Sequence, residues 1–283
     1  MANYKRKNVS ERKPAKKVRR RRKSKVGLKL FLIVFLLIIA GVGIAVSPIC
    51  NISKVVVEGN KVVSAKSITD TVSLPIGGNI FYSVNGSLFD KVFLTWNTYK
   101  EKLYSKFVFI KSADFRFNLG GKLVVKIIER TPMIYIPMGK KFALVDEDGV
   151  ILKIEDEKST DGKLSLTGFE LKDKVVGFKT NFKSNPGVVK MFRLFKFFKE
   201  YTTKIPAELI SKIVAFDVSN PNNLAVEFVD KRKVLLGDID VFQDTQLVYR
   251  FTFINSVFEK LKAGQEGVLD YSTSEDPIWK ITN

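Results

Sequence analysis

The sequence has 283 residues, of which 45% are hydrophobic, and it contains 23 Phe, one Cys and no His. Without His, a Ser-His-Asp triad, a Cys-His pair and a His-ligated zinc site are all excluded. The net charge of +19 would suggest a nucleic-acid binder, but residues 1–29 hold 14 Lys or Arg against one acidic residue, Glu11, and the remainder carries only +6.

A run of 19 residues from Leu28 to Val46 contains no charged side chain past Lys29. As a helix it would be roughly 28 Å long, which is close to the thickness of the bilayer hydrocarbon. It lacks the polar stripe of a surface helix. We therefore predict a transmembrane helix over residues 26–47.

The basic residues 1–25 are predicted to form a disordered tail that stays in the cytoplasm, which places residues 48–283 outside the membrane. Attraction to anionic lipid and control of topology are better roles for this tail than binding of nucleic acid, because it lies beside the membrane. A cleaved signal peptide is the alternative, since Ala45-Val46-Ser47 resembles a cleavage site. The long basic region and Pro48 favour a retained anchor. The residues expected to set the topology are Arg19, Arg20, Arg21, Arg22 and Lys23.

Residues 50–130 have the pattern of a small α+β domain. A β-branched strand over 52–58 is followed by a turn and by amphipathic helices over 64–72 and 87–103. Two further strands, 108–117 and 123–129, are joined by a Gly120-Gly121 loop and read as a hairpin. This β-α-α-β-β order predicts a small sheet covered on one face by two helices.

Residues 131–263 are predicted to form a second α+β domain with a mostly antiparallel sheet, and 264–283 a closing strand and C-terminal tail. The expected strands and helices are short strands within 133–154, a helix over 188–201, strands at 213–218, 224–229 and 233–236, a helix over 241–261 and a final strand over 267–271. The apolar stripe Met191–Phe198 is typical of core, although a partner groove is the alternative. Cys50 could be a free thiol or a lipidation site, but an ordinary apolar residue is the simpler interpretation.

The acidic clusters do not indicate an active site. Asp146-Glu147-Asp148-Gly149 is too short for a calcium loop and predicts a hairpin turn. Glu155-Asp156-Glu157 and the pair Asp238 and Asp240 could act as acid–base carboxylates, but solvated loops or helix caps explain them better. We therefore expect no catalytic, cofactor-binding or metal-binding residues.

Several motifs in this order resemble the POTRA domain and the β domain of the FtsQ/DivIB family of bacterial cell-division proteins. The resemblance covers the chain from the basic tail to the C-terminus. The motifs are Ile-x-x-Val-x-Val-x-Gly-Asn ending at Asn60, Gly78-Asn79-Ile80-Phe81, Glu129-Arg130-Thr131-Pro132, Val145-Asp146-Glu147-Asp148-Gly149, Leu164-Ser165-Leu166-Thr167-Gly168, Leu235-Leu236-Gly237 and Gly267-Val268-Leu269-Asp270. The family's Leu-Arg pair after that Asp is replaced by Tyr271-Ser272.

The resemblance implies a non-enzymatic scaffold at the division septum, without a cofactor. Its implied partners are bitopic proteins of the FtsB/DivIC and FtsL types, and indirectly the septal peptidoglycan synthase. The last strand is expected to be a sheet edge that receives a partner strand. The implied partner-binding residues are Val268, Leu269, Asp270, Tyr271, Ser272 and Trp279, and the implied recruitment domain includes Val55, Val57, Gly59 and Asn60.

Two other classes of protein are alternatives to this scaffold. A POTRA-bearing secretion or envelope-assembly component would require a downstream membrane barrel, for which the chain has neither the strands nor the length. A membrane-anchored wall enzyme would have to use carboxylates or a Ser-Lys pair.

Overall fold

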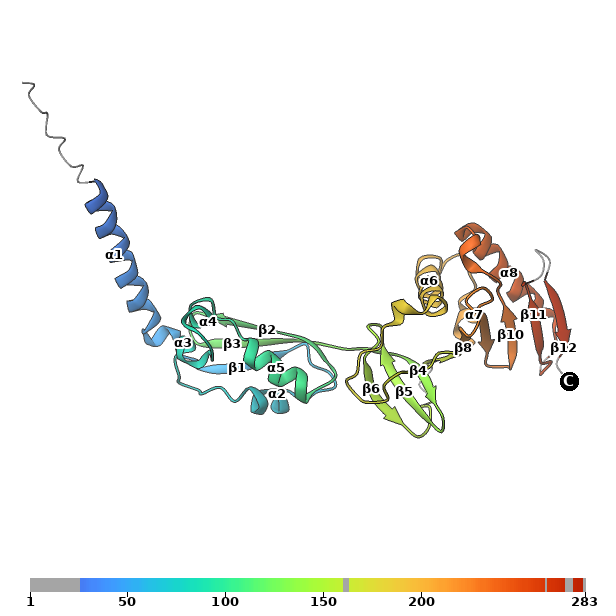
Figure 1. The fold of residues 1–283 in the computed structure, drawn as a ribbon, viewed down its shortest axis with the longest axis horizontal. Helices are drawn as coiled ribbons and strands as arrows, with labels where there is room; N and C mark the ends of the chain where they lie inside the picture. Colours follow the sequence, from blue (N-terminus) through green and yellow to red (C-terminus); the bar gives the residue numbers. More distant parts are fainter. Residues whose placement is uncertain (1–25, 160–162, 263, 273–276, 282–283) are drawn as a thin grey trace, which may run out of the picture.

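The computed structural model describes residues 26–159, 163–262, 264–272 and 277–281. A long N-terminal helix, a small domain and a larger domain follow one another along the longest axis (Figure 1). The helices are α1 Val26–Ala45, α2 Ala65–Val72, α3 Ile80–Ser83, α4 Leu88–Phe93, α5 Asn97–Lys106, α6 Pro186–Glu200, α7 Ala207–Ser211 and α8 Asp244–Lys260. The strands are β1 Lys54–Glu58, β2 Ile110–Asn118, β3 Lys122–Glu129, β4 Pro132–Met138, β5 Lys141–Asp146, β6 Ile151–Glu155, β7 Leu164–Thr167, β8 Ile213–Asp217, β9 Ala225–Phe228, β10 Arg232–Leu235, β11 Gly267–Asp270 and β12 Ile278–Ile281.

Helix α1 has the length and apolar composition needed to cross a membrane, and none of its residues is buried in the protein. Its C-terminal end is tied to the small domain: the Asn79 amide donates to the Ala45 carbonyl over 2.8 Å, and the Cys50 thiol to the Ile44 carbonyl over 3.3 Å. Cys50 is only 3% exposed, which favours its interpretation as a packed apolar residue. The run Arg19–Lys23 lies outside the described residues.

The small domain is built on a three-stranded sheet in the order β1-β3-β2. Strand β1 runs parallel to β3, while β2 and β3 form the expected antiparallel hairpin. Helices α2 and α5 pack over a core that includes Ile68, Leu103 and Leu123, all fully buried. The single helix expected over 87–103 is wrong. Leu94 adopts a left-handed conformation with φ of 50°, which ends α4 and separates it from α5.

The residues implied for recruitment hold β1 in place. Val55 and Val57 pack against the domain core. Gly59 has φ of +84°, and a Cβ there would lie 2.3 Å from the Ile127 carbonyl oxygen. Only Gly fits at that turn. The Asn60 side chain donates to the Val63 carbonyl over 2.9 Å, which closes the turn.

The larger domain contains one nine-stranded sheet in the order β12-β11-β10-β9-β8-β7-β4-β5-β6. Most neighbours are antiparallel, as expected, but β4, β7 and β8 are parallel neighbours and so are β10 and β11. The stripe of α6 is core, with Met191 and Leu194 fully buried. Strands β11 and β12 continue this sheet.

The motif Glu129-Arg130-Thr131-Pro132 joins the two domains through hydrogen bonds. Both carboxylate oxygens of Glu129 accept from backbone amides, those of Val62 and Val63, over 2.7 and 2.8 Å. Arg130 Nη1 donates to Asp146 Oδ2 over 2.7 Å, and Asp146 is 1% exposed. Asp146 Oδ1 accepts from the amides of Asp148 and Val150. The acidic cluster therefore forms the expected turn, and this turn binds the interdomain arginine.

We expect Arg130→Met to lower the free energy of unfolding by about 3 kcal/mol, because it leaves a buried carboxylate without its cation. The measurement is urea denaturation of the detergent-solubilised chain. Lys111→Met is the matched control, since Lys111 pairs with the more exposed Glu147 and Asp148 of the same turn. That change should cost less than about 1 kcal/mol. Equal losses in the two variants would contradict a structural role for the Arg130–Asp146 pair.

Candidate functional site: the open edge of the large sheet

Strand β12 forms one end of the nine-stranded sheet, and among the described residues it pairs only with β11. The prediction that residues 268–272 form the edge is wrong, because β11 lies between β10 and β12 and has both backbone edges occupied. Leu269, Asp270 and Tyr271 are also buried, at 1%, 4% and 5% exposure. The unpaired backbone groups belong to Ile278–Ile281 instead.

At the opposite end of the sheet, the chain itself covers the start of β6. The amide of Ile151 in β6 donates to the Phe178 carbonyl over 3.0 Å, and the Gly177 amide donates to the Ile151 carbonyl over 2.8 Å. An unpaired strand edge is a template for another chain, and proteins commonly cover it. Among the described residues, one end of the large sheet is covered at the start of β6, and the other end has no neighbour beyond β12.

Trp279 attaches β12 to the core. Its ring packs edge-on against Phe258 of α8, with centroids 6.3 Å apart. It also crosses Gly267, where a Cβ would lie 2.4 Å from Trp279 Cζ2. Trp279, which the resemblance implies as a partner-binding residue, is thus packed against the core of the domain. The apolar side chains that β12 does expose are Ile278, 50% exposed, and Ile281, 64% exposed.

An ion pair holds the other face of β12. Lys280 Nζ donates to Asp270 Oδ2 over 2.9 Å, and the Ser272 amide donates to Asp270 Oδ1 over 2.8 Å. Burial raises the pKa of Asp270, but the hydrogen bonds from Ser272 and Lys280 outweigh it and hold this pKa below its usual range. Lys280 is the charged residue that would discourage pairing at this edge, and its ammonium group is directed back to β11.

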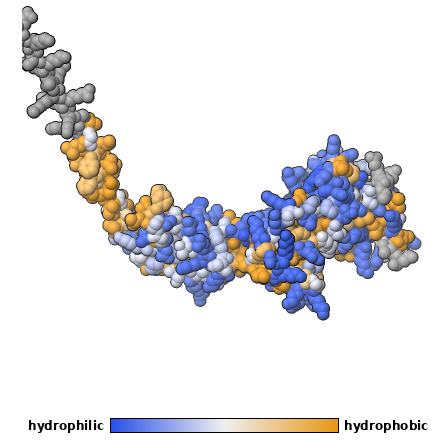
Figure 2. Space-filling model, in the orientation of Figure 1, coloured by the Kyte–Doolittle hydropathy of each residue, from blue (hydrophilic) through white to orange (hydrophobic). Residues whose placement is uncertain are grey.

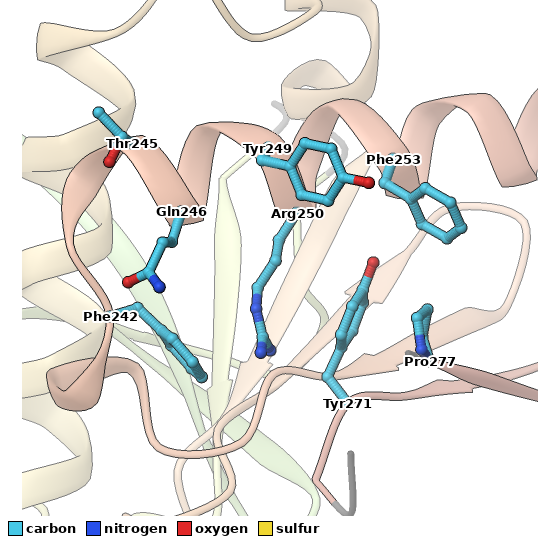
Figure 3. A pocket seen from close by; sticks show the side chains of 8 residues that line it. All are labelled: Phe242, Thr245, Gln246, Tyr249, Arg250, Phe253, Tyr271 and Pro277. Carbon is cyan, nitrogen blue, oxygen red and sulfur yellow. The ribbon is translucent and has the colours of Figure 1, made fainter. Parts of the chain in front are cut away.

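A pocket of about 300 Å³ lies between α8 and the start of β12. Figure 3 shows Arg250 between two aromatic rings, and the Tyr271 hydroxyl directed toward α8. The Arg250 guanidinium lies 3.8 Å from the Phe242 centroid and 4.6 Å from that of Tyr271. The pocket is lined by Phe242, Thr245, Gln246, Tyr249, Arg250, Phe253, Tyr271 and Pro277.

Two polar groups beside this edge lack a hydrogen-bond partner within the described part of the chain: the Tyr271 hydroxyl and Trp279 Nε1. An unpaired buried polar group costs about 1–3 kcal/mol. Burial raises the pKa of Tyr271 to about 12, so its hydroxyl remains protonated at neutral pH. Tyr271 and Trp279 therefore each keep an unused donor hydrogen in the buried surroundings of this edge.

No family model matches the chain. It is similar to the protein named cell division protein DivIB of Clostridium acetobutylicum, at 24% identity over 83% of this chain and 84% of the relative. It is also similar to the DivIB proteins of Clostridium tetani (24% identity over 82% of this chain and 79% of the relative) and of Bacillus subtilis (22% over 93% and 87%). These similarities support the resemblance to the DivIB/FtsQ family and a role in cell division.

Three of the carboxylates considered above as acid–base candidates make structural contacts. Asp238 accepts from Lys190 over 2.6 Å, and this hydrogen bond is the main cause of its lowered pKa. Asp240 accepts from Arg193 over 2.9 Å, and Glu155 accepts from the Tyr135 hydroxyl over 2.8 Å. In the ranges that the structure describes, no group of three or more His, Cys, Asp or Glu could hold a metal ion.

Sequence reasoning missed Arg250, Ile278 and Ile281. Arg250 follows Leu247 by three residues on the buried stripe of α8, so a cation within an apolar stripe was the available signal. Ile278-Trp279-Lys280-Ile281 contains β-branched and aromatic residues, but only four residues form the strand.

We expect the stability that Asp270 confers on this DivIB-like edge to depend on pH. Its pKa is lower when folded than when unfolded, so the contribution is complete above the unfolded pKa of about 4 and is lost as the pH falls through the folded pKa. Asp270→Asn should cost about 1–3 kcal/mol at neutral pH and progressively less in acid. Urea denaturation of both proteins at a series of pH values measures this. The exposed Asp173→Asn is the control; the same pH trend in both variants would refute the assignment.

Proposed function

We propose that the chain is a non-enzymatic scaffold of the bacterial division septum that binds bitopic partners outside the membrane. The partners are of the FtsB/DivIC and FtsL types, and through them the chain helps to control septal peptidoglycan synthesis. Helix α1 anchors it, with the basic tail in the cytoplasm and both domains outside. The cell-division role of the DivIB relatives and the apolar α1 support this proposal.

The open edge of β12 is the observation that carries the proposal. An extended partner segment can pair with Ile278–Ile281 as a further strand, each hydrogen bond contributing roughly 1 kcal/mol. Backbone pairing does not depend on side-chain identity, so it tolerates Tyr271-Ser272 in place of the family's Leu-Arg pair. Residues 268–272 then contribute indirectly, because β11 is paired with β12 and holds it in the sheet.

Specificity would come from side chains on both sides of the added strand. Ile278 and Ile281 are exposed apolar contacts, and the Arg250–Tyr271 pocket beside Pro277 can receive one partner side chain. An acceptor on that side chain would satisfy the Tyr271 hydroxyl. Central, desolvated aromatic and Arg residues are the usual source of binding energy at interfaces.

Depletion of the protein in its host should produce filamentous cells, and a fluorescent fusion should form a band at mid-cell. Time-lapse imaging during depletion, with the fusion expressed in its place, measures both. A uniform envelope signal with normal division would overturn the divisome role.

A photo-crosslinking amino acid at position 278 or 281 should capture a bitopic partner in growing cells. The same amino acid at position 229 should not capture it, because Val229 lies in the turn between β9 and β10 and not on β12. Val229 is a matched control for position 281, since the two side chains are 65% and 64% exposed. Mass spectrometry of the crosslinked species identifies the partner. Equal capture at positions 229 and 281 would contradict strand addition at β12, and Asp270→Asn should reduce capture at 281 by loosening β12.

A further inference from the structure

The small domain exposes a group of large apolar side chains at the end from which α1 leaves. Helix α4 has no buried residue, and its apolar side chains are 63–82% exposed: Leu88, Phe89, Val92 and Phe93. The rings of Phe89 and Phe93 lie against each other, with centroids 4.3 Å apart. Tyr82, at the end of α3, is 72% exposed. Surface helices normally direct such residues into a core.

The acidic residue of α4 is used for capping. The Asp90 carboxylate accepts from the amide and hydroxyl of Ser87 over 2.8 and 2.7 Å, and also from the Thr95 hydroxyl. These bonds fix both ends of this short helix through polar groups. The apolar side chains of α4 are therefore not required to hold the helix together, and they remain on the surface.

Hydrogen bonds fix this segment beside the base of α1. Asn79 bonds the Ala45 carbonyl through its amide and caps α3 by accepting from the Phe81 amide over 3.0 Å. The backbones of Ile52 and Gly78 are joined over 2.8 Å. Figure 2 shows the apolar surface of this segment next to the apolar surface of α1. A further apolar residue, Leu119 in the β2–β3 turn, is 74% exposed at the same end, where the Ser53 amide donates to the Gly121 carbonyl.

We propose that α4 and Tyr82 insert into the outer surface of the lipid bilayer, so that the small domain rests on the membrane that α1 crosses. This inference rests on the anchoring role of α1 in the proposed function. The bilayer is the occupant because the apolar surface continues directly from α1, which is exposed on all sides and must face lipid. Phe and Leu side chains commonly enter the boundary between headgroups and acyl chains, with Tyr at headgroup level.

The test uses the full-length chain in vesicles of phosphatidylcholine and phosphatidylglycerol, in a Cys50→Ser background. An environment-sensitive nitrobenzoxadiazole dye is attached to a single cysteine introduced by Phe93→Cys, Val62→Cys or Ile38→Cys. Val62 is the matched control, because it is 61% exposed but lies at the far end of the domain, next to Glu129. Position 38 reports whether α1 lies in the bilayer.

A spin label high on the lipid acyl chain should quench the dye at position 93 at least twofold more than the dye at position 62, with blue-shifted emission. Adding Leu88→Ser and Phe89→Ser should reduce quenching at 93 to the level at 62. Quenching at 38 without quenching at 93 overturns the contact of α4 with lipid but leaves the anchor intact. Blue-shifted but unquenched emission at 93 would mean that a protein, such as a second copy, covers α4, which also overturns it. No quenching at 38 would overturn the anchor and this inference together.

Discussion

The backbone N–H and C=O groups at the two ends of the large sheet are the constraint on which the rest of this structure depends. A sheet that is not closed into a barrel must cover these groups, leave them to water or pair them with another chain. The segment around Phe178 covers the start of β6, whereas β12 has no outer neighbour among the described residues and carries exposed isoleucines. Contacts within the chain hold β12 on both of its faces: Trp279 is packed against Phe258, and Asp270 binds Lys280. The open edge is thus held in a fixed position before any partner arrives.

The connection between the domains follows the same principle, since backbone amides and a buried charge must be satisfied. Glu129 accepts from two amides of the small domain, and Arg130 pairs with the buried Asp146 of the large one. Adjacent residues thus bind elements on either side of the boundary. Thr131 and Pro132 follow directly, so the connection has little length in which to bend. The motif therefore limits how the two domains can move relative to each other.

The sequence predicted those features that depend on local pattern. The apolar run gave α1, alternation and β-branching gave β1, β3 and the strands near β8 to β11, and the Gly59-Asn60 turn was correctly placed. The break at Leu94 was not predictable, because no Gly or Pro marks it and a leucine adopts the left-handed conformation. Nor was the sheet edge predictable. Whether β11 or β12 lies outermost depends on pairing between segments seven or more residues apart, and Ile278–Ile281 is too short to be distinguished from a tail. The position of Arg250 was not predictable either, because the rings of Phe242 and Tyr271 that flank it come from other segments of the chain.

The surface of α4 and the edge of β12 lie at opposite ends of the two domains, with α4 beside α1 and β12 in the domain farther from it (Figure 1). The bitopic partner that we propose would enter the same bilayer as α1, so it would have to bridge the distance from the membrane to β12 with its own structure. That distance has a defined value only if the small domain keeps a fixed tilt on the membrane and the interdomain connection is stiff. A single helix does not fix the tilt, because it can itself tilt within the bilayer. Contact of α4 with lipid supplies a second point of attachment, and the Arg130–Asp146 pair transmits the orientation to the large sheet. The reach of the proposed partner would then depend on these contacts as well as on β12 itself.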